Sequence, residues 1–297
     1  MFTSGRQDPS SFYKHMEYKR NCEIKSGMLF PETMKRIALG VEYNGTQFFG
    51  FQKQKPSVNT VQAALETGLT SVANENISLV CAGRTDAGVH ATCQVVHFDT
   101  LMDRPGKAWV QGVNSQLPGG VRVLWSKDVG PDFHARFSAS YRCYRYVIYA
   151  APIRSSIMES QVSWNCWELD ETEMHSAAIY LQGRHDFTSF RAAQCQAANP
   201  IREVKDISVK RRGRFIVLEI CANAFLYHMV RNIAGALIDV GRGARPASWM
   251  KELLELKDRK RAPAMASPQG LYLVDVGYPP EFGLPASSLG PLFLEVA

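Results

Sequence analysis

The feature that most constrains the fold is the order of hydrophobic patterns, which runs through a similar series twice along the chain. In each half a strand pattern is followed by a helix, a hairpin, a second helix and a closing strand. Apolar side chains alternate along residues 37–43, as in a half-buried strand, and recur at helical spacing along residues 61–72. This order predicts an α+β protein of two α/β halves, whose mainly antiparallel sheets join into one larger sheet. We expect helices to pack on one side of that sheet and a catalytic cleft to lie between the halves.

The two halves also set the predicted domain organisation. Residues 34–138 are predicted to form an N-terminal domain and residues 139–297 a C-terminal domain. Residues 1–33 are mixed and polar, lack the apolar segment of a signal peptide, and are expected to form a flexible extension.

Strands and helices can be placed approximately from periodicity and from turn residues. The expected strands cover residues 37–43, 77–81, 93–98, 121–126, 141–149, 207–221 (a hairpin) and 271–276. The expected helices cover residues 61–72, 107–114, 170–181, 229–240 and 248–256. Two helices are predicted to begin with capping boxes, formed by Asn59 with Gln62 and by Asp170 with Glu173.

A polar turn at residues 82–91 is the strongest candidate for a functional loop. It connects two predicted strands and carries one carboxylate, Asp86, between Gly83 and Gly88. The glycines allow a sharp bend and the close approach of a ligand to the backbone. An aspartate between glycines is most often a turn residue that bonds its own backbone, so the turn alone is weak support for catalysis.

Composition narrows the class of protein. The chain has 297 residues, of which 45% are hydrophobic, and a formal net charge of +6, which weakly favours a polyanionic partner such as nucleic acid. Its seven cysteines are widely spaced and form no C-x-x-C pair, which argues against a disulfide framework and against a zinc knuckle. We therefore expect most of them to be reduced, as in a cytoplasmic protein. No apolar segment approaches the length of a membrane span, so no membrane association is expected.

Several kinds of active site are absent from the sequence. It contains no P-loop, no HExxH motif, no EF-hand loop, no nucleophile elbow and no dinucleotide-binding fingerprint. The seven histidines are dispersed and suggest no local metal site. Any chemistry is therefore expected to use side chains alone, with neither cofactor nor metal.

Four ordered motifs resemble those of the tRNA pseudouridine synthase A (TruA) family, and the resemblance extends from about Lys35 to residues 290–294. The motifs are GRTDAGVHA at 83–91, FHARFSA at 133–139, RCYRYVIY at 142–149 and FLYHMVRNIAG at 225–235. The resemblance implies the pseudouridine synthase fold and a homodimeric enzyme without cofactor or metal. It also implies a tRNA substrate whose uridines 38, 39 and 40, in the anticodon stem-loop, are isomerised to pseudouridine.

The resemblance further assigns roles to four residues. Asp86 matches the catalytic aspartate and Arg231 the arginine that pairs with it, so that a guanidinium would favour the ionised carboxylate. Tyr144 matches the active-site tyrosine, which can stack on the flipped uracil and serve as an acid or base. Arg84 matches an arginine that contacts tRNA and holds the flipped base. His90 and Phe225 are expected to support the motifs structurally.

Each of these residues also has an ordinary explanation. By pattern alone Arg231 would be a surface helix residue, Tyr144 a cross-strand packing residue and Arg84 a solvated turn charge. The basic clusters at residues 211–214 and 257–261 are candidate phosphate contacts or simply solvated loops.

Two other functions are compatible with parts of the sequence. A non-catalytic RNA-binding protein would retain the basic loops but would not need a carboxylate, which repels phosphate. A glycoside hydrolase would use Asp86 together with a second carboxylate, for which Glu42 is the only acid in a nearby strand.

Overall fold

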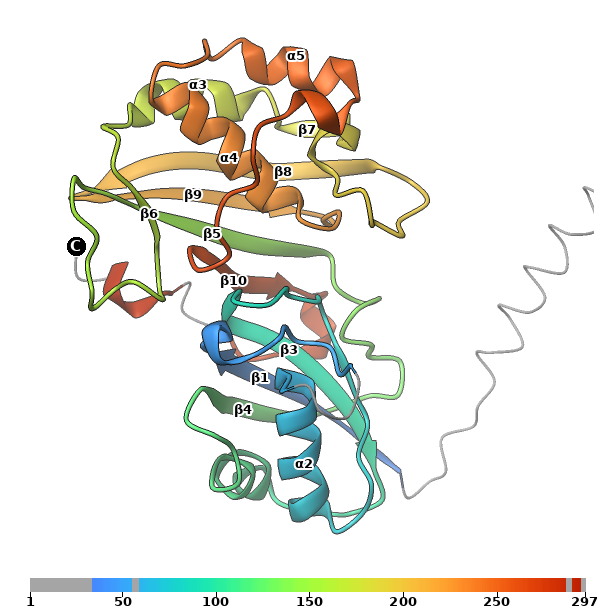
Figure 1. Cartoon of the computed structure of the whole chain (residues 1–297). Coiled ribbons are helices and arrows are strands. Elements are labelled where there is room, and N and C mark those ends of the chain that lie inside the picture. The colour runs from blue at the N-terminus through green and yellow to red at the C-terminus, as the bar shows by residue number, and fades with distance from the viewer. Residues whose placement is uncertain (1–33, 55–58, 287–289, 295–297) are drawn as a thin grey trace, which may run out of the picture. The chain divides into compact units, whose positions relative to one another are not determined.

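A computed structural model describes residues 34–54, 59–286 and 290–294 (Figure 1). Residues Lys35–Ala297 form one compact unit. The predicted N-terminal extension, residues 1–33, lies outside the described residues. The predicted division at residue 138 falls between two strands, β4 (Val121–Val129) and β5 (Tyr141–Ala150), and remains a prediction.

One ten-stranded sheet runs through the described chain, in the order β4-β1-β3-β10-β5-β9-β8-β7, with β2 beside β3 and β6 beside β5. All pairings are antiparallel except β10 with β3 and β5 with β6. The mixed α+β architecture and the large, mostly antiparallel sheet confirm the predicted fold class. The strands are β1 (Lys35–Tyr43), β2 (Leu79–Cys81), β3 (His90–Thr100), β4 (Val121–Val129), β5 (Tyr141–Ala150), β6 (Ser163–Asn165), β7 (Gly183–Asp186), β8 (Ile201–Arg212), β9 (Phe215–Ala222) and β10 (Leu271–Gly277).

Strand β10 joins the two halves of the sheet. It comes from the end of the chain, yet it lies between β3 of the first half and β5 of the second. It pairs with β3 in parallel through Tyr272 and His90, and with β5 antiparallel through Leu273 and Tyr144. The loop that precedes β3 and the side chains of β5 are therefore brought to the same part of the sheet.

The helices are α2 (Val61–Ala73), α3 (Glu171–Ile179), α4 (Met229–Gly241) and α5 (Trp249–Leu256). Helix α3 packs on β8 and on α4, and α4 contacts β5 (Figure 1). Their apolar side chains share one core with those of α2 and β1, whereas a second, smaller core covers the opposite face of β5, β9 and β10. This arrangement agrees with the expectation that the helices pack on one side.

The alternation of side chains along β5 places the candidate tyrosine on the helix-bearing face. Tyr144, Tyr146 and Ile148 belong to the large core, whereas Cys143 and Val147 belong to the small one. Because successive strand residues point to opposite faces, the motif of β5 supplies both cores at once.

Local signals in the sequence predicted some element ends correctly and others wrongly. Asp170 caps α3 as predicted, since its carboxylate accepts hydrogen bonds from the backbone N–H groups of Thr172 and Glu173. The cap of α2 was predicted one residue too early. Thr60 accepts from the backbone N–H of Ala63, whereas the side chain of Asn59 donates to the carbonyl of Gln47.

Two further differences from the predicted elements concern the geometry of one helix and two short strands. The expected helix at 107–114 is helical, but its middle, Ala108–Gly112, widens into a π-turn. Strands β6 and β7 were not predicted, because three and four residues are too few to show a period.

One cysteine pair departs from the expected absence of a disulfide framework. Cys143 and Cys221 face one another directly in the β5–β9 register and form a disulfide. Their separation of 78 residues hid this pairing from the sequence. Cys81, Cys93, Cys166 and Cys195 take part in no disulfide within the described chain, as expected for most of the cysteines.

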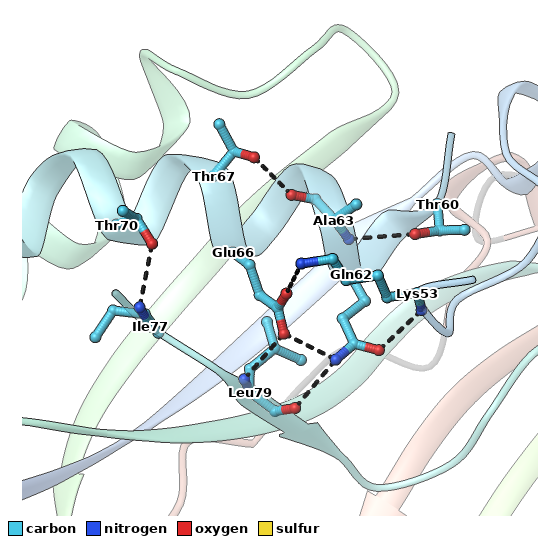
Figure 2. A network of polar contacts seen from close by, with 9 residues as sticks. All are labelled: Lys53, Thr60, Gln62, Ala63, Glu66, Thr67, Thr70, Ile77 and Leu79. Atoms are coloured by element: carbon cyan, nitrogen blue, oxygen red, sulfur yellow. Dashed lines mark hydrogen bonds and ion pairs between the residues drawn. The ribbon is translucent and has the colours of Figure 1, made fainter. Parts of the chain in front are cut away.

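A buried carboxylate fixes α2 against the strand that leads into the candidate loop (Figure 2). Glu66, which is 8% exposed, accepts hydrogen bonds from the side chains of Lys53 and Gln62 and from the backbone N–H of Leu79. Gln62 also accepts from the backbone N–H of Lys53. The start of β2, seven residues before Asp86, is thus held by side chains of α2.

Replacement of Glu66 by alanine should lower the free energy of unfolding by about 2 kcal/mol, because a buried backbone donor loses its acceptor. Glu66→Gln should lower the free energy of unfolding by less, since the amide oxygen can still accept a hydrogen bond from the backbone N–H of Leu79. Chemical denaturation of both variants measures the difference. Thr67→Ala, an exposed neighbour on the same helix, serves as the control, with an expected change within about 0.5 kcal/mol. A Glu66→Ala variant as stable as this control would contradict the role of Glu66 in holding β2 against α2.

Candidate active site

The loop between β2 and β3 is held on both sides, so that its backbone is fixed while one carboxylate remains accessible. Thr85 is buried, its hydroxyl lies 2.8 Å from the hydroxyl of Tyr43, and its carbonyl accepts from the backbone N–H of Phe51 at 3.0 Å. The carbonyl of Asp86 accepts from the N–H of Val89 at 3.1 Å, which closes a tight turn. Gly88 has φ +78°, a conformation that side-chain-bearing residues rarely adopt.

Asp86 lies beside two basic side chains that come from the start of α4. One carboxylate oxygen, Oδ2, is 3.3 Å from Nε2 of His228 and 3.7 Å from Nη1 of Arg231. The Asp86 side chain is 24% exposed, which leaves room for a substrate to reach it. The structure therefore brings together the predicted Asp86 and Arg231, which are far apart in the sequence.

Arg231 is anchored independently of Asp86. Its side chain is 10% exposed, its Nε donates to the carbonyl of Ala266 at 2.9 Å, and its own carbonyl accepts from the N–H of Ala266. These bonds leave Nη1 directed at the carboxylate. A surface helix arginine, the ordinary explanation for this residue, would be neither buried nor anchored in this way.

Burial and charge act on Asp86 in opposite directions. Partial burial raises the pKa of the Asp86 carboxyl above its ordinary value, whereas His228 and Arg231 lower it. Burial is the largest of these influences, so the arginine moderates the rise without reversing it. Burial lowers the pKa of the His228 imidazole, and the negative charge of Asp86 partly offsets this decrease. Of the charged groups that act on Asp86 in the described chain, none is acidic.

Tyr144 lies next to the loop but is enclosed. It is 8% exposed, and its ring meets Phe225 edge-on at a centroid distance of 4.9 Å. Its hydroxyl borders Gly83, where an added Cβ would lie 3.6 Å away. Burial raises the pKa of the Tyr144 phenol, which therefore stays protonated at neutral pH.

Arg84 is exposed on the loop, and within the described chain no hydrogen bond or ion pair of its side chain is seen. His90, which follows the loop, is structural in its contacts. Its Nδ1 accepts from the N–H of Gly45, its ring stacks on Tyr272, and burial lowers its pKa to about 4. Glu42, the second acid considered, lines a cavity with Tyr272 and Phe293 and is not among the groups that act on Asp86.

Sequence reasoning gave no role to His228 or to Arg142. Arg142, 9% exposed, donates to four carbonyls, those of Ala82, Arg136, Ala139 and Asn223. The available signal was the presence of two arginines, Arg142 and Arg145, in an otherwise aromatic and apolar strand.

No cluster of three or more His, Cys, Asp or Glu side chains that could hold a metal ion occurs among the residues that the structure describes. Nor does that part of the chain contain a helix long and apolar enough to cross a membrane.

Comparison with known proteins gives a consistent assignment. Among solved structures, a chain of the Cbf5-Nop10-Gar1 complex is only distantly similar, with a TM-score of 0.32 and 13% identity over 80% of this chain and 49% of that chain. The family model for tRNA pseudouridine synthase matches residues 40–138 and 177–279. The tRNA pseudouridine synthases A of Shewanella loihica and Vibrio campbellii are 56% and 55% identical over 259 residues, which cover 87% of this chain and 99% and 98% of theirs. The chain therefore belongs to the tRNA pseudouridine synthase A family.

Proposed function

We propose that this chain isomerises uridines 38, 39 and 40 of the tRNA anticodon stem-loop to pseudouridine, with Asp86 as the catalytic carboxylate. The observation that carries the proposal is the position of Asp86, partly exposed on a fixed loop and flanked by His228 and Arg231. Strong sequence similarity to tRNA pseudouridine synthases A along nearly their whole length supports the reaction and its substrate.

The reaction breaks the bond between C1′ of the ribose and N1 of uracil, turns the base, and joins C1′ to C5. The proton on C5 is then released and N1, freed from the sugar, gains a proton, so that the product is an isomer of the substrate. An ionised carboxylate can attack either the sugar at C1′ or the base, and both routes begin from the same form of Asp86. Arg231 and His228 orient that carboxylate, and Arg231 favours its ionised form.

Tyr144 contributes as a protonated phenol in this proposal. Because burial raises its pKa, the hydroxyl stays protonated and is suited to donate a hydrogen bond, and it is poorly suited to act as a base at neutral pH. Its place beside Gly83 puts the hydroxyl at the edge of the loop that presents Asp86.

The two predicted basic clusters differ in what they can offer to RNA. In the first, Arg211 pairs with Glu171 and Arg212 donates to the carbonyl of Leu294, so both have structural partners. In the second, Lys260 and Arg261 are exposed. Their neighbour Arg259 donates to the side chain of Asn232 in α4, which ties this segment to the helix of Arg231. We therefore assign phosphate contacts to Arg84, Lys260 and Arg261.

The proposal includes the wider organisation that family membership implies. The enzyme is a cytoplasmic homodimer that needs neither cofactor nor metal. Within each subunit, residues 34–138 and 139–297 act as two domains, with the carboxylate loop contributed by the first.

Replacement of Asp86 by asparagine should lower turnover by about 10³-fold or more, because the amide has the same shape but cannot attack. Release of tritium from tRNA that carries 5-³H-uridine measures the rate, since C5 loses its hydrogen when it joins C1′. Affinity for tRNA should stay within a few-fold. Asp170→Asn is the matched control, because asparagine also caps a helix and turnover should not change. Normal turnover by Asp86→Asn would end the catalytic assignment.

Replacement of Arg231 by glutamine should move the acidic limb of the pH–rate profile to higher pH. The carboxylate must be ionised, so the rate falls as pH drops through the pKa of Asp86. Removal of a positive charge raises that pKa further. The profile of kcat/KM, which reports the free enzyme, tests this. Arg242→Gln, at the other end of α4, should leave the limb in place. A limb that stays or moves to lower pH in Arg231→Gln would contradict the pairing.

Replacement of Tyr144 by phenylalanine should lower kcat by about 10²-fold, because the ring is kept and the hydroxyl that donates a hydrogen bond is lost. Binding of tRNA should be nearly unchanged. Tyr149→Phe, on the same strand, provides the control and should behave as wild type. Equal kinetics for Tyr144→Phe and wild type would reduce Tyr144 to a packing residue.

A further inference from the structure

We propose that Phe137 is a stacking platform for an unpaired base of the tRNA, next to the target uridine. The inference rests on the proposed function and deepens it, since it concerns how the same site holds its substrate. Phe137 lies in the motif at 133–139, to which the proposed reaction gives no other role. Its side chain is 77% exposed, although it follows a segment whose Phe133 and Ala135 are fully buried.

The exposed ring belongs to a rigid loop. His134 accepts hydrogen bonds at Nδ1 from the backbone N–H groups of Arg136 and Phe137, both at 3.1 Å. The N–H of His134 donates to the hydroxyl of Ser138, and the N–H of Ser138 donates to the carbonyl of His134. These four bonds fix the backbone around Phe137 without help from RNA, so little ordering is needed when a base binds.

One face of the Phe137 ring is already covered. The ring of His134 lies against it at a centroid distance of 4.3 Å and an interplanar angle of 30°. Because Nδ1 of His134 is an acceptor and its pKa is lowered by burial and by Arg36, the histidine is neutral. With 77% of its surface exposed, most of the Phe137 side chain still remains open to solvent, as a platform for a flat aromatic ligand requires.

The loop around Phe137 is connected through one nitrogen atom to the catalytic loop, the turn at residues 82–91 that carries Asp86. Nη2 of Arg142 donates to the carbonyl of Arg136 at 2.6 Å and to the carbonyl of Ala82 at 2.9 Å. In the sequence, Phe137 directly follows Arg136 and Gly83 directly follows Ala82. The platform is therefore held beside the segment that presents Asp86, near enough to serve a nucleotide adjacent to the reacting one.

The surrounding charge suits nucleic acid. Arg136 is exposed, with its guanidinium 5.5 Å from the centre of the Phe137 ring, and Arg84 is exposed on the catalytic loop. An aromatic ring with cationic neighbours is the usual means of holding a single-stranded base and its phosphates.

The test combines a protein substitution with removal of single bases from the RNA. Binding is measured with Asp86→Asn protein, so that the RNA is not converted, and with tRNAs that carry one abasic nucleotide at each position flanking the target. Phe137→Ala should raise Kd for intact tRNA by about 10-fold. One abasic position should raise Kd by a similar factor when Phe137 is present, and should have little further effect on Phe137→Ala. Phe137→Trp should restore binding.

Trp167→Ala is the matched control, because Trp167 is another exposed aromatic residue, 55% exposed, and Kd should stay within 2-fold. A change of less than 2-fold for Phe137→Ala, or additive effects at every abasic position, would overturn the proposal. So would a change of oligomeric state in Phe137→Ala, since the ring would then serve a protein interface. Because the readout is binding, it remains valid if wild-type protein releases no tritium, and the two proposals can fail separately.

Discussion

The site depends on a single buried cation, the guanidinium of Arg142. It donates to the carbonyls of Ala82, Arg136, Ala139 and Asn223, which belong to three different segments of the chain. Buried carbonyls in loops must find donors, and these have none in a strand or helix ladder. A planar group with five fixed donors can satisfy four carbonyls at once, whereas a lysine ammonium has only three donors. The catalytic loop, the Phe137 loop and the segment leading to α4 therefore have fixed relative positions before any RNA binds.

The fixed loop places the carboxyl of Asp86 under two opposing influences on its ionisation. The enclosure that fixes the loop also removes water from the carboxylate, and burial alone would favour its neutral form. His228 and Arg231 act against that effect, and both come from the start of one helix. Arg231 is itself tied to the carbonyl of Ala266, so the charge is held in position even when the carboxylate is protonated. The effect of burial on the ionisation of Asp86 is thus moderated by residues that follow it by more than 140 positions in the sequence.

The sequence predicted features that depend on neighbouring residues. It did not predict features that depend on the order of the strands in the sheet. Asp170 could be identified as a cap because its partners are two and three residues away. The strand that carries Tyr144 could be predicted because aromatic and β-branched residues, which favour strands, are concentrated in it. The insertion of β10 between β3 and β5, and the Cys143–Cys221 bond, could not be predicted, since neither leaves a mark on its neighbours. For the site, glycines marked the loop of Asp86, but periodicity alone would have left Arg231 on the surface, where the structure buries it.

His228 shows how strain enters this arrangement. Its backbone is left-handed, with φ 62°, a conformation that costs a residue with a side chain about 1 kcal/mol. Helix α4 begins here without a side-chain cap, so helix formation alone does not explain the conformation. The left-handed turn has two other effects: Nε2 lies 3.3 Å from Asp86, and the ring stacks on Tyr227 at a centroid distance of 3.7 Å. A residue in ordinary helical conformation would direct its side chain elsewhere. The strain is therefore best understood as the cost of bringing an imidazole to the carboxylate while Arg231, three residues later, approaches the same oxygen.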